Sequence, residues 1–305
     1  MAFPDDAVFK DIGVIDTMMG TTAGTTGKDR YAFLDRALKD AESANMNFPA
    51  QYMFKDVPFS DQARDADGEL DEPPQGSALL LPFMDRANVE IAMVGCKPEG
   101  DGYGNQCVQD HPDRFIAAYE ADPNEGVDAL RKIRKMHTEL GLRAVTAFPS
   151  GRNPQVPIDA PLMYPIYALC VELGIPIFCC AGIPGPRVPF DAQHVRRIDN
   201  VMYDFPGLTF VTRHGCEPWE DLAVKLMLKW PGLHYSTSAF APKHYPEAII
   251  KYANTRGAEK VIYGGYFPMG LSLDKIFEQM RDVPFRDHVW EPFLRGNAKR
   301  VLGLD

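Results

Sequence analysis

The chain has 305 residues, of which 45% are hydrophobic and 24% charged, a composition typical of a folded globular protein. The formal net charge of −10 argues against a basic surface for nucleic acid, so no nucleic-acid partner is expected. The first six residues lack the basic and apolar regions of a secretory signal, so none is expected. Glycines, prolines and Glu172 interrupt the most apolar stretch, residues 164–186, so no membrane span is expected.

Short β-branched and aliphatic runs alternate along the chain with amphipathic segments of helical period. The predicted strands are Gly13–Asp16, Val89–Val94, Phe115–Tyr119, Ala144–Phe148, Ile177–Cys180, Thr209–Thr212, Leu233–Thr237 and Val261–Gly264. The predicted helices include Asp29–Glu42, Val127–Leu140, Leu162–Leu173, Glu217–Lys229 and Tyr245–Thr255. Eight such units predict a single (β/α)8 TIM-type barrel over residues 1–305. The alternative is an open doubly wound sheet, for which no convincing glycine fingerprint follows the first strand.

One interval, between Asp16 and Val89, is too long for a single crossover. We therefore expect residues 17–88 to form an insertion within the barrel, either a lid over the substrate or a solvated loop without a role. Its acidic part, Asp56–Glu72, carries most of the negative charge. The glycine-rich stretch Gly20–Lys28 lacks the spacing of a phosphate-binding loop and is expected to be a mobile loop.

Candidate catalytic residues follow the predicted strands at the barrel end where active sites collect. After the sixth strand, Arg213, His214 and Glu217 offer an anion-binding group, a proton carrier and an orienting carboxylate. The alternative is that His214 and Glu217 only make a strand-end hydrogen bond and a helix-start charge. Asp16 ends the first strand and Tyr266 follows the eighth, and either could act as an acid, a base or a hydrogen-bond partner.

The six cysteines are expected to be free thiols, because Cys179 and Cys180 are adjacent and no CxxC pair exists. Free thiols are typical of a reducing compartment, so a cytoplasmic location is expected. Cys180 ends the fifth strand and is a candidate nucleophile, although a buried cysteine is more often apolar filler. The histidines show none of the usual zinc-binding spacings.

In this order, the motifs resemble the amidohydrolase superfamily, and within it the amidohydrolase-related branch that includes aminocarboxymuconate-semialdehyde decarboxylase. The resemblance covers nearly the whole chain. It rests on Val14-Ile15-Asp16, His111-Pro112-Asp113-Arg114-Phe115, Gly141-Leu142-Arg143-Ala144-Val145, Gly174-Ile175-Pro176-Ile177-Phe178, His214-Gly215, Ser236-Thr237-Ser238-Ala239, Gly257–Gly264 and Gly296–Leu304.

The resemblance implies a distorted barrel with a divalent metal at its mouth, held by an HxH pair on strand one, one His each on strands five and six, and an Asp on strand eight. Four of these five positions have changed, and they carry Met18, Gly20, Cys180 and Tyr266. Only His214 keeps the residue of the metal-binding members, so no metal and no other cofactor are expected. The alternative is a zinc site rebuilt from His214, Cys180 and Asp16.

Two functions remain open on the sequence. The first is a metal-independent enzyme that acts on a small anionic cyclic or aromatic substrate, either by hydrolysis of a lactone, ester or other activated carbonyl, or by carbon–carbon cleavage such as decarboxylation. His214 would act as general acid or base. The substrate would contact Arg213, Trp219, Lys243, His244 and Met18.

The second function is a non-catalytic barrel that serves as a binding or subunit-interaction module. Loss of most metal-ligand positions fits such a change, whereas the polar residues around His214 favour an enzyme. A homodimer is expected only because members of the resembling family are often dimers.

Overall fold

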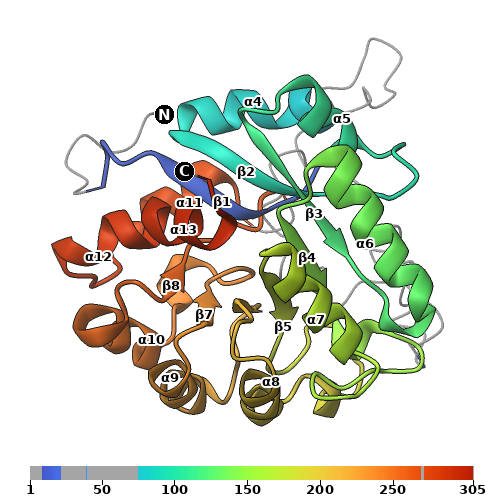
Figure 1. The fold of residues 1–305 in the computed structure, drawn as a ribbon. Helices are drawn as coiled ribbons and strands as arrows, with labels where there is room; N and C mark the ends of the chain where they lie inside the picture. Colours follow the sequence, from blue (N-terminus) through green and yellow to red (C-terminus); the bar gives the residue numbers. More distant parts are fainter. Residues whose placement is uncertain (1–8, 22–38, 40–74, 269–270, 305) are drawn as a thin grey trace.

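Eight parallel strands pair in sequence order, from β1 to β8, in the computed structural model (Figure 1). The structure describes residues 9–21, 39, 75–268 and 271–304. The strands are β1 (Val14–Met19), β2 (Val89–Gly95), β3 (Phe115–Glu120), β4 (Ala144–Ala147), β5 (Ile177–Cys180), β6 (Phe210–Arg213), β7 (Leu233–Ser236) and β8 (Val261–Ile262).

The first and last strands meet just beyond the end of β8 and bring the sheet round to a barrel. Met19 forms a parallel bridge with Phe267, and the backbone N–H of Gly20 donates to the Phe267 carbonyl at 2.7 Å. The Tyr266 N–H donates to the carbonyl of Met18 at 2.9 Å. An open doubly wound sheet would leave these two edges apart, so the predicted (β/α)8 barrel is confirmed.

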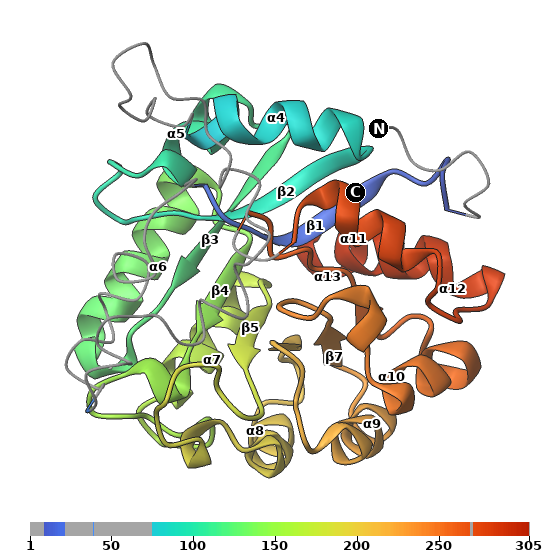
Figure 2. The same cartoon turned by 180° about the vertical axis from the view of Figure 1, so that it is seen from behind.

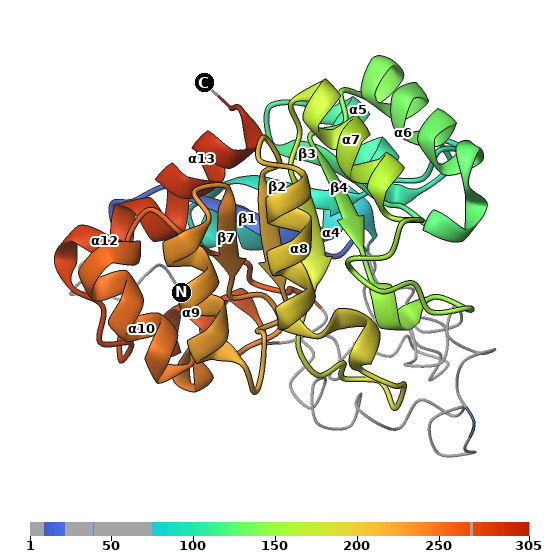
Figure 3. The same ribbon diagram turned by 60° about the horizontal axis from the view of Figure 1, so that its bottom comes forward.

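Helices surround the strands in all three views (Figures 1–3). They are α4 (Gly76–Arg86), α5 (Tyr103–Asp110), α6 (Val127–Leu140), α7 (Tyr164–Leu173), α8 (Ile198–Asp204), α9 (Glu220–Lys229), α10 (Glu247–Tyr252), α11 (Leu273–Met280), α12 (Asp287–Glu291) and α13 (Asn297–Leu302). Helix α6 has the predicted bounds: Ala129, Ile133 and Met136 bury one face, and Gly141 ends it in the left-handed conformation.

The region expected to be an insertion contains an ordinary barrel helix. Helix α4 lies within residues 17–88, and its Leu79, Leu80 and Met84 are buried in the layer between strands and helices. The predicted helix Asp29–Glu42 and the acidic stretch Asp56–Glu72 lie outside the described residues, apart from residue 39.

Strand side chains alternate between two cores. The larger core lies between strands and helices, and the smaller one fills the barrel. The inner core contains Ile15, Met93, Ile116, Ala118, Ala144, Phe178, Val211 and Ile262, with Ala298 and Leu302 of α13 packed against it. Four residues lie two positions beyond an inner-core residue of their own strand and so point inward at the carboxyl end of the barrel. They are Thr17, Glu120, Cys180 and Arg213.

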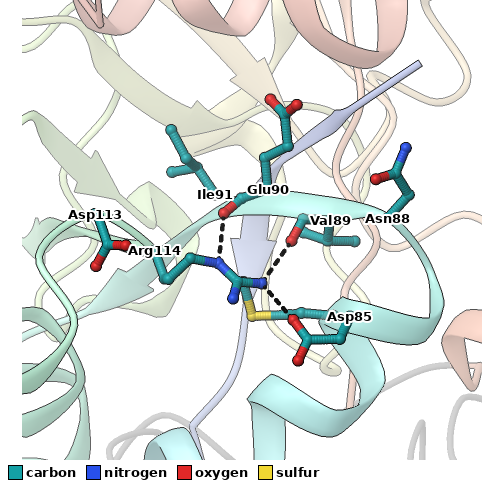
Figure 4. Close-up of a pocket in the computed structure, with 8 residues that line it drawn as sticks. Asp85, Asn88, Val89, Glu90, Ile91, Asp113 and Arg114 are labelled. Carbon is teal, nitrogen blue, oxygen red and sulfur yellow. Dashed lines mark hydrogen bonds and ion pairs between the residues drawn. The ribbon is translucent and has the colours of Figure 1, made fainter. Parts of the chain in front are cut away.

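The opposite end of the barrel has a surface hollow of about 460 Å³ beside the starts of β2 and β3 (Figure 4). Its arginine, Arg114, donates to the carbonyls of Glu90 at 2.9 Å and Val89 at 3.1 Å and pairs with Asp85 at 2.8 Å. These bonds tie strands to a helix, which is a stabilising role common at this end of such barrels. No helix in the described ranges combines the length and apolar character needed to cross a membrane.

Candidate active site

Arg213 is the central charged residue at the carboxyl end of the barrel. It ends β6 and is only 6% exposed. One Nη nitrogen lies 3.4 Å from Glu120 Oε2 at the end of β3, and the side chain also hydrogen bonds to Cys180. Burial by itself lowers the pKa of Arg213, but Cys180 and Glu120 more than offset this, so the guanidinium is charged. Its buried Nε has no partner among the described residues.

A second arginine contacts the same glutamate. Arg152 donates to Glu120 Oε1 at 2.8 Å and to the Ala121 carbonyl at 3.1 Å. Its Nη1 also lies 3.9 Å from Asp122. Glu120 therefore lies between two guanidinium groups, each with a buried Nε atom that has no partner in the described part of the chain. Such groups retain capacity to bind an anion.

His214 follows Arg213 and has a backbone φ of 63°. The left-handed region is unusual for a residue with a side chain, and such strain clusters at functional sites. Its Nδ1 lies 3.1 Å from Ser238 Oγ, and its ring meets Tyr266 edge-on with centroids 5.1 Å apart. Burial, together with the charge of Arg213, lowers the pKa of His214 well below its usual value, so the imidazole is neutral at pH 7.

The turn after His214 requires a glycine. Gly215 has a φ of 103°, and a Cβ atom there would lie 2.3 Å from the ring of Phe240. The chain can therefore reverse directly after the histidine only with this residue. Ala239 and Tyr266, which follow β7 and β8, have φ values of 70° and 61°. Three successive strands thus end in strained residues at the mouth.

Tyr266 borders His214 from the side of β8, and Met18 of β1 lies next to Tyr266. Tyr266 is 9% exposed, and its backbone is bonded to the carbonyl of Met18. A Cβ atom on Gly264 would lie 3.1 Å from the Cβ of Ser238 and 3.4 Å from that of Met18. Met18, Ser238 and Tyr266 therefore surround one small region beside the imidazole.

Asp16 has its own buried environment. Its Oδ1 accepts from the backbone N–H groups of Met18 at 2.9 Å and Gly265 at 2.8 Å, whereas its buried Oδ2 has no hydrogen-bond partner within the described ranges. A Cβ atom on Gly265 would lie 2.5 Å from both Asp16 Oδ2 and the hydroxyl of Tyr263, which belongs to the outer core. Burial raises the pKa of Asp16 to about 7, although the two backbone hydrogen bonds act against it. The structure thus brings Asp16 to Tyr263 and the β1–β8 junction.

Cys180 lies inside the barrel beside Arg213. It is 2% exposed. Burial raises the pKa of its thiol, and the neighbouring Arg213 only partly offsets this effect. All six cysteines are free and buried, as expected from the sequence. A raised pKa keeps the thiol protonated and a weak nucleophile at neutral pH.

The remaining predicted site residues lie on the rim. Glu217 is exposed on the rim. The pKa of its carboxyl is raised, because partial burial and the charge of Glu220 outweigh the opposing effect of His244. Trp219 stacks on the ring of His194, with centroids 3.9 Å apart. Lys243 and His244 are exposed in a short turn after β7.

Sequence reasoning did not single out Glu120, Arg152 or Ser238. Glu120 could have been found, because it is a carboxylate at the inward-facing end of a predicted strand. Arg152 and Ser238 lie in loops after β4 and β7, and their partners are distant along the chain. Ser238 belongs to the motif Ser236-Thr237-Ser238-Ala239, which assigned it no role in the site, and no local motif marks Arg152.

The amidohydrolase family model matches residues 49–304, and the chain belongs to that family. The predicted membership is therefore confirmed, as is the prediction of an enzyme, a hydrolase or carbon–carbon lyase of this superfamily, over a non-catalytic barrel. A search of curated proteins gave no match.

Solved structures share the fold at low sequence identity. An uncharacterised TIM-barrel protein from Bordetella bronchiseptica is 22% identical with a TM-score of 0.71, over 96% of this chain and 99% of that one. The 5-carboxyvanillate decarboxylase of Novosphingobium aromaticivorans, with bound manganese, is 15% identical with a TM-score of 0.64, over 99% of both chains. A dihydroxybenzoic acid decarboxylase from Polaromonas, with manganese and 2-nitroresorcinol, is 13% identical with a TM-score of 0.66, over 96% of this chain and 97% of that one.

These structures correct one prediction. No cofactor was expected, but decarboxylases of this superfamily contain bound manganese, so that expectation is contradicted. The residues of the alternative zinc site do not converge: Asp16 Oδ1 accepts two backbone N–H groups, Cys180 bonds to Arg213, and His214 Nδ1 faces Ser238. In the described part of the chain, no group of three or more His, Cys, Asp or Glu side chains could hold a metal ion. These residues do not fit the manganese of the solved decarboxylases.

Proposed function

We propose that the chain is a carbon–carbon lyase that removes a carboxylate from a small anionic aromatic or cyclic compound. The observation that carries this proposal is the pairing of a buried, charged Arg213 with the adjacent imidazole of His214 at the barrel mouth. An arginine with an unpartnered buried Nε suits a carboxylate, and a neighbouring imidazole suits proton transfer at the carbon that bears it. The solved decarboxylases with this fold, whose names contain benzoate-type compounds, support the substrate class.

In this proposal Arg213 binds the carboxylate of the substrate and Arg152 contributes charge from the next loop. Glu120 occupies the space between them, so the substrate carboxylate competes with Glu120 for the guanidinium of Arg213. Removal of the carboxylate requires a proton at the ring carbon as the bond to the carboxyl carbon breaks. His214 is the proposed general acid and base for that proton.

We propose that Tyr266, which borders the imidazole, and Met18, whose carbonyl accepts from the Tyr266 N–H, form the walls of the binding region. We also propose that the protonated thiol of Cys180, beside Arg213, contacts the substrate. Asp16 is proposed to act at a distance, by fixing the turn that carries Tyr266 through its hydrogen bond to Gly265.

Four rim residues complete the proposed site. Lys243 and His244 attract an anionic substrate, and Glu217 orients water or the substrate at the entrance. Trp219 offers an apolar face beside them.

Hydrolysis of an activated carbonyl, such as a lactone or ester, is the second candidate. The observation in its favour is the neutral state of His214, since a neutral imidazole is the form that acts as a general base. Both reactions use the same residues, so one set of substrates can separate them.

The test is a panel of hydroxybenzoates, a carboxyvanillate and aromatic lactones, assayed with and without added Mn²⁺. Loss of substrate absorbance and release of CO₂ identify decarboxylation, whereas acid release without CO₂ identifies hydrolysis. His214→Ala should abolish turnover, and His288→Ala, which changes an exposed histidine on α12, should not. Full activity in His214→Ala, or no turnover of any compound by the wild type, would refute the proposal.

Three broader expectations stay proposals. We propose one catalytic domain over residues 1–305 with an insertion within residues 17–88, most of which lies outside the described residues. We also propose a homodimer and a cytoplasmic location, the latter because all six cysteines are free. Light scattering of the purified protein tests the dimer.

A further inference from the structure

Ser238 makes two contacts with one residue of the proposed site. It lies two residues after β7 and is fully buried. Its Oγ is 3.1 Å from the backbone nitrogen of His214 and 3.1 Å from Nδ1 of the same residue. The hydroxyl therefore bridges the main chain and the ring of the histidine.

The two contacts have different donors. The backbone N–H of His214 can only donate, so Ser238 Oγ is the acceptor in the first hydrogen bond. The hydroxyl proton still needs an acceptor, because an unpaired buried hydroxyl is costly. Nδ1 of His214 lies at hydrogen-bonding distance and supplies one.

We infer that Ser238 donates its hydroxyl proton to Nδ1 and thereby holds His214 as the neutral tautomer with its proton on Nε2. Nδ1 faces the buried Ser238, so Nε2, on the other edge of the ring of this half-buried residue, is the nitrogen left to meet a bound compound. His214 then meets a bound compound as an Nε2–H donor, the form that suits the general-acid role at the ring carbon and not the general-base role of the second candidate. Ser238 is a positioning residue for the proposed reaction, and this catalytic meaning rests on the proposed function.

The surroundings leave Ser238 little room to move away. A Cβ atom on Gly264 would lie 3.0 Å from Ser236 Oγ and 3.1 Å from the Cβ of Ser238, so the ends of β7 and β8 are closely packed there. On the other side, the edge-on contact with Tyr266 restricts the ring of His214. The hydroxyl and the ring are therefore held against each other by both strands.

The tautomer can be measured without any substrate. In ¹⁵N-histidine-labelled protein at neutral pH, His214 should show a pyridine-type Nδ1 and a pyrrole-type Nε2, assigned by the signals that His214→Gln removes. Ser238→Ala should shift the pair toward the other tautomer. Ser238→Thr, which keeps the hydroxyl, should retain the wild-type signals, as should Ser150→Ala, which removes a buried hydroxyl in the turn after β4.

A pyrrole-type Nδ1 in the wild type, or unchanged signals in Ser238→Ala, would overturn the inference whatever the enzyme does. If a substrate is found, Ser238→Ala should lower kcat about fivefold to tenfold with little change in KM, because the hydroxyl orients the ring and does not touch the substrate. If no substrate is found but the spectra are as expected, the proposed function fails and the tautomer stands.

Discussion

Replacement of Gly265 by alanine tests the packing at the β1–β8 junction. The new Cβ would lie 2.5 Å from Asp16 Oδ2 and 2.5 Å from the hydroxyl of Tyr263. An ordinary carbon–oxygen contact is about 3.3 Å, so one partner must move by about 0.8 Å. The carboxylate cannot retreat freely, since its Oδ1 accepts from the Gly265 N–H at 2.8 Å and from the Met18 N–H at 2.9 Å.

Overpacking of this kind costs about 1–3 kcal/mol, and a stretched hydrogen bond to a buried carboxyl adds about 1 kcal/mol. Gly265→Ala should therefore lower the free energy of unfolding by about 2–4 kcal/mol and the Tm by about 3–6 °C for a chain of this length. Urea and thermal unfolding followed by circular dichroism measure both. Gly95→Ala is the control, because its Cβ would meet no atom within 4 Å. If the two variants unfold alike, the junction is not close-packed.

Three further changes have defined outcomes. Burial and the charges of Lys260 and Arg300 lower the pKa of His234 to about 3. Below pH 6.5 a proton binds this histidine in the unfolded chain but not in the folded one, so the free energy of unfolding falls by about 1.4 kcal/mol for each unit that the pH is lowered, down to pH 3. Urea unfolding of His234→Gln should lack this contribution, and an equal pH dependence in the two proteins would contradict it. Arg213→Lys should lower kcat/KM about 100-fold for a carboxylate substrate and much less for its neutral ester, whereas equal losses would exclude carboxylate binding. Native protein at pH 8 should resist iodoacetamide at Cys180 and the other buried thiols, and mass spectrometry that finds rapid labelling would overturn that inertness.

The barrel was predictable because its signal is repetitive. Each strand is a short apolar run followed by a helix of regular period, and all eight predicted strands are present. The prediction of Arg213 and His214 at the mouth follows from the same rule, since both stand at the end of β6. Helix α9 was expected to begin at Glu217 but begins at Glu220, because the residue before Pro218 avoids helical geometry.

The partners of the site were not predictable from local sequence. Asp16 was taken as the last residue of its strand, but β1 continues to Met19 through irregular register with β2. The side chain of Asp16 instead bonds to Gly265, which is 249 residues later. Ser238 likewise meets His214 only because β6 and β7 are neighbours in the barrel.

The seam between β1 and β8 has a consequence for how the enzyme gains activity as it folds. Thr17 bonds to the Tyr263 carbonyl, Met18 to Tyr266, and Asp16 to Gly265, so each bond across the seam joins residues near opposite ends of the chain. Contacts of such long sequence separation form late, because the loop entropy must be lost first. Tyr266 takes its place beside His214 only when the seam closes. A nascent or partly folded barrel thus contains His214 without the neighbouring tyrosine, and closure of the seam is the step that completes the proposed site.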